Sequence, residues 1–346
     1  MDTSTLLYSL TATLLRALCL PLHIFTLMIE YILSCFRLNR RPPHHVFITG
    51  AASGMGRALA LHYAKKHSAL SLTDLNLEGL IETQSFALAE GSPFCKVEKL
   101  DVRDALAMKK FMEMRDKDVN EGGGGPIDLV LAVAGLIESR VAGGRALDDL
   151  ELGVRSLIDV NIIGLINTVL PAIHLMRKRG RGQIGVLSSL AEKDFFSSLY
   201  PAYAASKCFA TSWALGLRAH LQETGVSINV FAPGAVRTPL LAPVEGLDPH
   251  YDLSSRGPDW IVHSPIIELT AESAALAWAK GLERNQALTR PHHLYSLLCN
   301  DCCLSCPREA HDLLARNRIY MLWGWRPKTN PAHSWATHEK SGLEKK

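Results

Sequence analysis

The sequence predicts an α/β fold in which helices cover both faces of a doubly wound parallel sheet. Short β-rich runs alternate with helix-length amphipathic segments, and the first run ends in a glycine-rich turn that opens a helix. A repeated strand–helix–strand pattern requires crossover connections, which make neighbouring strands parallel. The chain has 346 residues, 47% hydrophobic and 21% charged, which is enough for one large domain of this kind with additions.

The strands and helices of this domain follow one another in regular order. The expected strands cover His45–Thr49, Leu70–Asp74, Val97–Val102, Ile127–Ala134, Gln183–Ser189 and Ser227–Ala232. The spacing of apolar residues predicts helices that include Met55–Lys66, Ala105–Val119, Leu150–Lys178 and Pro201–Glu223. We expect one domain over residues 42–322, a hydrophobic segment at 1–41 before it and a polar tail at 323–346 after it.

An apolar run from Leu6 to Phe36 precedes the domain and meets a basic cluster that ends at Arg41. A bilayer core needs about 20 apolar residues, so this run is long enough to anchor the chain in a membrane. A cleaved signal peptide would carry positive charge before its apolar region, whereas Asp2 precedes this one and the first basic residue is Arg16. We therefore expect the segment to be retained.

A polar stripe interrupts the apolar run, because Arg16, His23 and Glu30 recur every seven residues and would share one side of a helix. Such a stripe suits a tilted or interfacial helix, a hairpin bent at Pro21, or a span packed on protein. The alternative is an N-terminal helix packed on the soluble domain. If the segment spans the membrane, the basic cluster after it places the domain on the cytosolic side.

Charge and cysteine usage exclude other classes. Lys and Arg total 37 and Asp and Glu total 34, and the chain lacks the concentrated basic patch of a nucleic-acid-binding protein. Eight cysteines are too few for a disulfide scaffold, so we expect reduced thiols. The cluster Cys299, Cys302, Cys303 and Cys306 leaves open a metal site, S-acylation near a membrane, or buried thiols on a helical stripe; we expect no bound metal.

The turn after the first strand has the composition of a phosphate-binding turn. It reads Thr49-Gly50-Ala51-Ala52-Ser53-Gly54-Met55-Gly56, immediately before a predicted helix. Glycines permit a tight turn and close backbone approach to a pyrophosphate, which would lie on the free N–H groups of the helix N-terminus. We predict that Gly50, Ser53, Gly54, Met55 and Gly56 bind a dinucleotide in a Rossmann-type sheet, although an ordinary strand-to-helix turn would also fit this pattern alone.

An acidic residue ends each of the next two strands. Asp74 can accept hydrogen bonds from the adenosine ribose hydroxyls and would repel a 2′-phosphate, so we expect NAD in preference to NADP. Arg57 is the residue that argues against this preference. Asp101 and Val102 are candidates for contacting the adenine, with helix capping by Asp101 and Asp104 as the alternative.

Tyr203 and Lys207 are four residues apart on a predicted helix, so both project from one face. A free tyrosine, with a pKa of about 10, is a poor base at neutral pH. A neighbouring ammonium and the positive charge of a nicotinamide would favour its phenolate, which makes the pair a candidate proton relay.

These motifs together resemble the classical short-chain dehydrogenase/reductase family over roughly residues 44–290. The resemblance rests on the glycine turn, Asn161, Ser189, Tyr203 with Lys207, and Pro233-Gly234, which occur in the family's order. It implies that Tyr203 exchanges a proton with the substrate oxygen and that Ser189 hydrogen-bonds that oxygen. It also implies that Lys207 binds the nicotinamide ribose and lowers the tyrosine pKa, and that Asn161 holds a water of a proton relay.

The resemblance adds further cofactor contacts. They fall on Ala134, Gly135, Pro233, Gly234, Val236 and Thr238, in addition to Tyr203 and Lys207. Two features depart from the family pattern. Ala132-Val133-Ala134-Gly135 replaces the usual Asn-Asn-Ala-Gly, which puts local rigidity in doubt. Ser189 also precedes Tyr203 by one residue more than is usual, so Ser188 remains the alternative to Ser189.

The implied activity is hydride transfer between nicotinamide and an alcohol or carbonyl. The segment Leu240–Ile267 is rich in Leu, Pro and Gly and is expected to form an apolar substrate cover. With the apolar N-terminus, this resembles membrane-attached retinol and hydroxysteroid dehydrogenases, which implies a hydrophobic substrate, residence at the endoplasmic reticulum or lipid droplets, and homodimerisation through the Leu150–Lys178 and Pro201–Glu223 helices. The alternative is a dinucleotide-binding scaffold or sensor on a membrane or lipid droplet, without turnover.

Overall fold

The computed structural model describes residues 42–117, 124–137, 150–192, 201–241 and 269–291, all within one compact unit that spans Met1–Cys303. The predicted N-terminal segment, the polar tail, the domain end at 322 and the cysteine cluster lie outside the described residues. So does the predicted substrate cover, apart from its first residues Leu240 and Leu241.

A parallel sheet forms the centre of the unit. It contains seven strands in the order β3-β2-β1-β4-β5-β6-β9, and all its pairings are parallel. The strands are β1 (His45–Thr49), β2 (Ala69–Asp74), β3 (Cys95–Lys99), β4 (Leu129–Ala132), β5 (Gly182–Leu187), β6 (Val226–Phe231) and β9 (Leu288–Thr289). The order reverses direction between β1 and β4, which is the position at which a doubly wound sheet binds ligands. The predicted doubly wound fold is confirmed.

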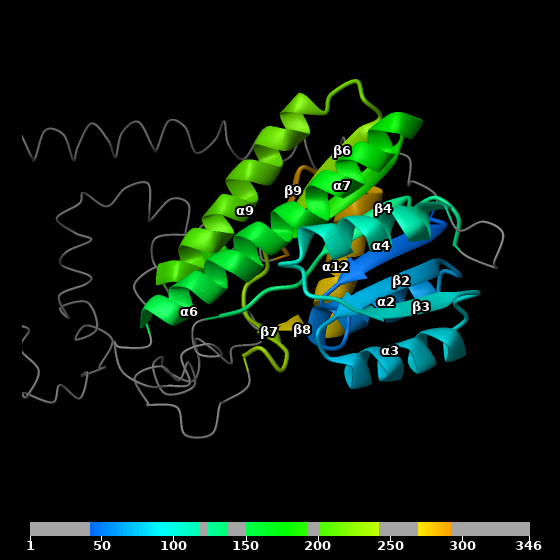
Figure 1. The fold of residues 1–346 in the computed structure, drawn as a ribbon, viewed down its shortest axis with the longest axis horizontal. Coiled ribbons are helices and arrows are strands. Elements are labelled where there is room, and N and C mark those ends of the chain that lie inside the picture. The colour runs from blue at the N-terminus through cyan, green and yellow to red at the C-terminus, as the bar shows by residue number, and fades with distance from the viewer. Residues whose placement is uncertain (1–41, 118–123, 138–149, 193–200, 242–268, 292–346) are drawn as a thin grey trace, which may run out of the picture. The chain divides into compact units, whose positions relative to one another are not determined.

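Helices cover both faces of the sheet (Figure 1). Helices α2 (Gly54–Ala64), α3 (Leu77–Ala89) and α12 (Ala271–Glu283) contribute to one hydrophobic core, in which Trp278 stacks on Phe231 with ring centroids 5.1 Å apart. Helices α4 (Ala105–Lys117), α7 (Gly164–Arg179) and α9 (Pro201–His220) contribute to a second core. A short two-stranded sheet, β7 (Val236–Arg237) and β8 (Leu269–Thr270), follows β6.

The prediction for the third strand was wrong at its carboxyl end. We expected Val97–Val102, whereas β3 covers Cys95–Lys99. The chain turns after it, because the Asp101 carboxylate accepts hydrogen bonds from the Arg103 backbone and guanidinium. Asp104 then accepts a hydrogen bond from the Ala107 backbone at 2.9 Å and caps α4.

The expected helix over Leu150–Lys178 contains a change of winding. α6 (Leu150–Leu157) leads into a π-helical segment, η2 (Ile158–Ile163), and then into α7. Such π segments inside α-helices frequently mark functional sites. Glu151–Arg179 is apolar and long enough to cross a membrane by length and composition, and half of its most apolar part is buried inside the domain.

Thr49 at the end of β1 holds the segment after β4, where this chain lacks the asparagine pair. Its hydroxyl accepts hydrogen bonds from the backbone N–H groups of Val133 at 3.1 Å and Ala134 at 3.3 Å. The backbone beyond the paired part of β4 is therefore tied to β1 without the two amide side chains.

Candidate functional site

The glycine turn brings the end of β1, the start of α2 and the segment after β4 together. Gly50 and Gly54 have φ values of +69° and +52°, which L side chains rarely adopt. A Cβ on Gly50 would lie 2.8 Å from the Ala134 nitrogen, and one on Gly56 would lie 2.0 Å from the Gly50 carbonyl oxygen. The turn therefore depends on glycine for both its conformation and its close packing.

The N-terminus of α2 is suited to an anion. Ser53 occupies the N-cap position with extended backbone and is exposed, and its side chain makes no capping hydrogen bond. The first N–H groups of a helix lack partners within the helix, and its dipole favours negative charge there. The dinucleotide that the fold implies fits this turn, because its pyrophosphate could take the donors that no side chain caps.

Asp74 lies directly beside the turn. Its Oδ2 accepts a hydrogen bond from the Ala52 backbone and its Oδ1 one from the Asn76 backbone, both at 3.0 Å. A carboxylate offers about four acceptor positions, so Asp74 keeps capacity for the two hydroxyls of a ribose. The predicted position of this acid next to the glycine turn agrees with the geometry.

Arg57 points toward α3. Its guanidinium donates to Glu82 at 2.6 Å, to Thr83 at 3.0 Å and to the Ala52 carbonyl at 2.6 Å, and it lies 5.9 Å from the centre of the Phe86 ring. These contacts hold the turn on α3. The guanidinium of Arg57, the cation that would favour a 2′-phosphate, is therefore already engaged within the chain.

Asp101 and Val102 have partners within the chain. Both Asp101 oxygens receive hydrogen bonds from Arg103, which hold the pKa of this carboxyl below its ordinary value. Val102 is buried, and a Cβ on Gly164 would lie 2.5 Å from its Cγ2. Their predicted contact with the adenine stays a prediction.

Four of the predicted residues come together near the carboxyl ends of β4 and β5. A Cβ on Gly135 would lie 3.3 Å from the Asn161 Oδ1 and 3.6 Å from the Lys207 Nζ. Lys207 Nζ lies 5.5 Å from the centre of the Tyr203 ring. Tyr203 precedes Lys207 by one helical turn on α9. Segments far apart in the sequence thus bring an amide, an amine and a phenol side chain into one region.

Lys207 is buried, with 5% of its surface exposed, and its Nζ donates to the Leu187 carbonyl at 3.0 Å. Burial lowers the pKa of this ammonium to about 8. At neutral pH the side chain is still mainly charged. A buried positive charge therefore lies beside the phenol ring.

Asn161 is fixed by both ends of its side chain. Its Oδ1 accepts from the Leu136 backbone at 2.7 Å, and its Nδ2 donates to the Leu136 carbonyl at 2.9 Å and to the Ser206 hydroxyl at 3.0 Å. Ser206 in turn donates to the Tyr203 carbonyl at 2.7 Å. The π segment is thereby joined to the first turns of α9. The sequence reasoning missed Ser206, although its position directly before Lys207 is a signal that could have found it.

Ser189 and Ser188 play different roles after β5. Ser188 is buried, and its hydroxyl lies 3.0 Å from the Lys207 carbonyl oxygen and 2.7 Å from the Thr211 hydroxyl. The Ser189 hydroxyl accepts a hydrogen bond from the Ala191 backbone at 3.1 Å. Because internal contacts occupy Ser188, we retain Ser189 as the candidate for contacting a substrate.

The segment after β6 passes both halves of the site. The Pro233 carbonyl accepts a hydrogen bond from the Leu190 backbone at 2.8 Å, next to Ser189. Gly234 follows, and Val236 is buried in the core. A Cβ on Gly54 would lie 3.1 Å from the Thr238 Cγ2, so Thr238 lies against the glycine turn.

A model of the short chain dehydrogenase family matches residues 44–246, more than half of the chain. The chain belongs to the short-chain dehydrogenase family. Membership makes it an oxidoreductase of a family that uses nicotinamide dinucleotides, in agreement with the turn and with the tyrosine–lysine pair.

Curated relatives support the oxidoreductase assignment. An uncharacterized oxidoreductase of Myxococcus xanthus is 34% identical over 195 residues, which are 56% of this chain and 73% of that protein. The 3-dehydrosphinganine reductase TSC10B of Arabidopsis thaliana is 30% identical over 199 residues, 56% of each protein. The matches cover between 14% and 75% of the length of the curated relatives, so the substrates that their names give are properties of those proteins.

Solved structures share the fold. A short-chain dehydrogenase from Sphingobium yanoikuyae in complex with NADPH has a TM-score of 0.59 at 20% identity, and the match covers 82% of this chain and 97% of that one. At this level of identity the similarity establishes the fold alone.

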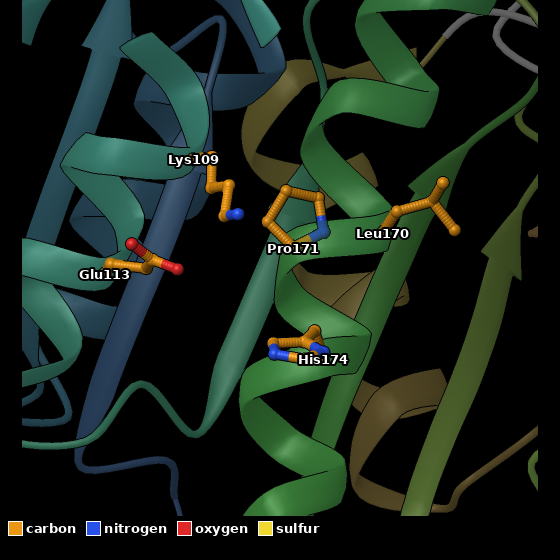
Figure 2. A pocket seen from close by; sticks show the side chains of 5 residues that line it. All are labelled: Lys109, Glu113, Leu170, Pro171 and His174. Atoms are coloured by element: carbon orange, nitrogen blue, oxygen red, sulfur yellow. The ribbon is translucent and has the colours of Figure 1, made fainter. Parts of the chain in front are cut away.

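A separate surface hollow of about 250 Å³ lies between α4 and α7 (Figure 2). It is lined by Lys109, Glu113, Leu170, Pro171 and His174, none of which belongs to the glycine turn or to the predicted catalytic set. Within the described part of the chain, no group of three His, Cys, Asp or Glu side chains is arranged to hold a metal ion.

Proposed function

We propose that the chain transfers a hydride between NAD and a hydrophobic alcohol or its carbonyl, with Tyr203 as proton donor and acceptor. The observation that carries this proposal is the position of Lys207, whose Nζ lies between the Leu187 carbonyl and the Tyr203 ring, next to Gly135. Charged lysines are rarely buried unless they are paired. A purely structural lysine on this helix would gain more from solvent.

Each side chain has a distinct part in the proposed reaction. Bound nicotinamide would supply or accept the hydride. The Lys207 ammonium favours the phenolate of Tyr203 by its charge, so that the hydroxyl can release or recover a proton near neutral pH. Ser189 donates a hydrogen bond to the substrate oxygen and orients it. Asn161 fixes the π segment against α9 and holds a water that connects the phenol to solvent.

The carboxylate of Asp74 supports NAD as the preferred cofactor. A 2′-phosphate at this position would meet a negative charge, and the guanidinium of Arg57 is already bound to Glu82 and the Ala52 carbonyl. NADP remains the second choice, and the NADPH complex of the Sphingobium structure illustrates that this fold accepts it.

The proposal of a hydrophobic substrate is supported by three sequence features and by one relative. The features are the apolar run before Phe36, the apolar cover that begins at Leu240, and the run from Asp74 to Thr83, which resembles that of membrane-attached family members. The relative TSC10B is named as a 3-dehydrosphinganine reductase, which acts on a lipid ketone. A membrane-bound enzyme at the endoplasmic reticulum or lipid droplets, facing the cytosol, would meet such substrates directly. The chain would form a homodimer through the Leu150–Lys178 and Pro201–Glu223 helices.

A Tyr203→Phe comparison tests the proposal. Long-chain and polycyclic alcohols and ketones are screened with NAD and NADH, and the appearance or loss of NADH absorbance reports turnover. The variant should lose at least a hundredfold in kcat on every active substrate, while its affinity for NADH stays within about threefold. Ser212→Ala, an exposed position on the same helix, is the matched control. Turnover that survives Tyr203→Phe would reject the proposed chemistry.

A further inference from the structure

The Glu192 carboxylate is the centre of a buried hydrogen-bond network that includes Ser188, next to the candidate Ser189. Only 5% of its side chain is exposed, and its Oε1 receives a hydrogen bond from Arg290 at 2.8 Å. Its Oε2 lies 3.1 Å from the Ser188 hydroxyl and also receives a hydrogen bond from Thr211. We call the group Glu192, Arg290, Ser188 and Thr211 the Glu192 cluster.

The Glu192 cluster joins the two segments that carry the predicted reacting groups. Glu192 ends the short helix η3 (Leu190–Glu192), and its backbone N–H donates to the Ser189 carbonyl at 3.1 Å, so the carboxylate belongs to the turn that begins at Ser189. On the other side, Thr211 follows Lys207 by one helical turn on α9. Tyr203, Lys207 and Thr211 therefore share one face of that helix.

Two further contacts join the same pair of segments, and a third ties the turn to another part of the chain. The Ser188 hydroxyl lies 3.0 Å from the Lys207 carbonyl oxygen, and the Cys208 thiol lies 2.9 Å from the Glu192 carbonyl oxygen. The Leu190 backbone donates to the Pro233 carbonyl at 2.8 Å, which ties the turn to the segment after β6. Arg290, directly after β9, adds the edge of the sheet to this arrangement.

We propose that Glu192 is a positioning residue: through Arg290, Ser188 and Thr211 it sets the placement of Ser189 relative to Tyr203 and Lys207. The inference rests on the proposed function. A carboxylate is suited to this role because charge-assisted hydrogen bonds are stronger and more directional than neutral ones, and because a buried carboxylate requires partners in defined positions. Reacting groups must be aligned closely, so a small shift of the Ser189 turn costs rate even when every side chain is present.

The cluster is separate from the cofactor turn. The residues that would hold the pyrophosphate and the ribose follow β1 and β2, whereas the cluster follows β5 and β9. Glu192→Ala should therefore lower kcat at least tenfold on the best substrate from the screen and leave the affinity for NADH within about threefold. Glu192→Gln keeps an acceptor for Thr211 but loses the charge paired with Arg290. Its kcat should lie between that of the parent and that of Glu192→Ala.

A second, partly buried ion pair provides the matched control. Arg179 donates to Asp116 at 2.6 Å and to the Ile127 carbonyl at 2.7 Å, and it lies at the end of α7, before β5 begins. Asp116→Ala removes a comparable ion pair and should lower thermal stability without changing kcat in the folded protein. If Glu192→Ala does not fold, Thr211→Val removes one hydrogen bond of the cluster and should still lower kcat severalfold.

The kcat values of folded, full-length variants test the positioning role of Glu192. A kcat within twofold of the parent in Glu192→Ala, or in Thr211→Val if the former is unfolded, overturns the positioning role. An equal loss of kcat in Asp116→Ala also overturns it, because the effect would then be one of general stability. Failure of the proposed function is distinguishable, since it would appear as turnover that survives Tyr203→Phe.

Discussion

Replacing Lys207 by Met should stabilise the folded chain at neutral pH while it removes activity. The lysine is buried, and burial lowers its pKa from 10.5 to about 8. That difference corresponds to about 3 kcal/mol of free energy spent to keep the ammonium charged in the folded protein. Met has a similar shape, but it cannot donate to the Leu187 carbonyl, and the loss of this charge-assisted hydrogen bond costs about 2 kcal/mol. The net gain at pH 7 is about 1 kcal/mol.

The gain should depend on pH in a defined direction. Below pH 8 the lysine is protonated in both the folded and the unfolded chain, so the full cost is present. Between pH 8 and 10.5 the unfolded chain binds this proton more tightly than the folded chain, and the stability of the parent protein rises with pH. Between pH 7 and pH 9.5 the difference in unfolding free energy between Lys207→Met and the parent should shift by about 2 kcal/mol in favour of the parent.

Urea denaturation in a mild detergent, repeated from pH 7 to 9.5 without cofactor, measures the difference. Lys280→Met, at an exposed lysine on α12, should give no such pH-dependent difference. A Lys207→Met variant that is less stable than the parent at pH 7, by an amount that does not change with pH, would refute the reasoning. The same variant should lose at least a hundredfold in kcat.

Three further predictions concern the cofactor turn and the N-terminus. Asp74→Asn, which keeps an acceptor but loses the charge, should raise kcat/KM with NADPH relative to NADH at least tenfold; an unchanged ratio would contradict the ribose assignment. Gly56→Ala places a Cβ 2.0 Å from the Gly50 carbonyl oxygen and should lower both Tm and the affinity for NADH. The control is Gly216→Ala, which has open space around it and should raise the free energy of unfolding by up to about 1 kcal/mol. Deleting residues 1–41 should move the protein from the membrane fraction to the soluble fraction, and continued sedimentation with membranes would show that this segment is not the sole anchor.

Local patterns predicted the central strands well because each is a short buried run with a clear boundary. β1 has the predicted bounds, and β2 begins one residue earlier than predicted, since the glycine turn and Asp74 end them. β3 ends early because of the turn around Asp101 and Arg103, which depends on a side-chain interaction that hydrophobic periodicity does not report. Helices α3 and α12 were not singled out, although each begins with a capping side chain, Asn76 and Thr270.

The candidate site was predictable as a set of residue types but not as a network. The spacing of Tyr203 and Lys207 places both on one helix face, and the structure agrees. The π segment around Asn161 depends on its bonds to Leu136, 25 positions away, and the pairing of Glu192 with Arg290 joins residues 98 positions apart. Such contacts are set by the packing of the sheet and helices. No periodicity in the chain encodes them.

An experimental structure of the full-length protein with bound NAD tests the central claim most directly. We predict that the pyrophosphate lies on the N-terminus of α2, that Asp74 binds the ribose hydroxyls of the adenosine, and that the Tyr203 hydroxyl and Lys207 Nζ face the nicotinamide half. A dinucleotide bound elsewhere, or a Tyr203 hydroxyl directed away from the nicotinamide ring, would contradict it.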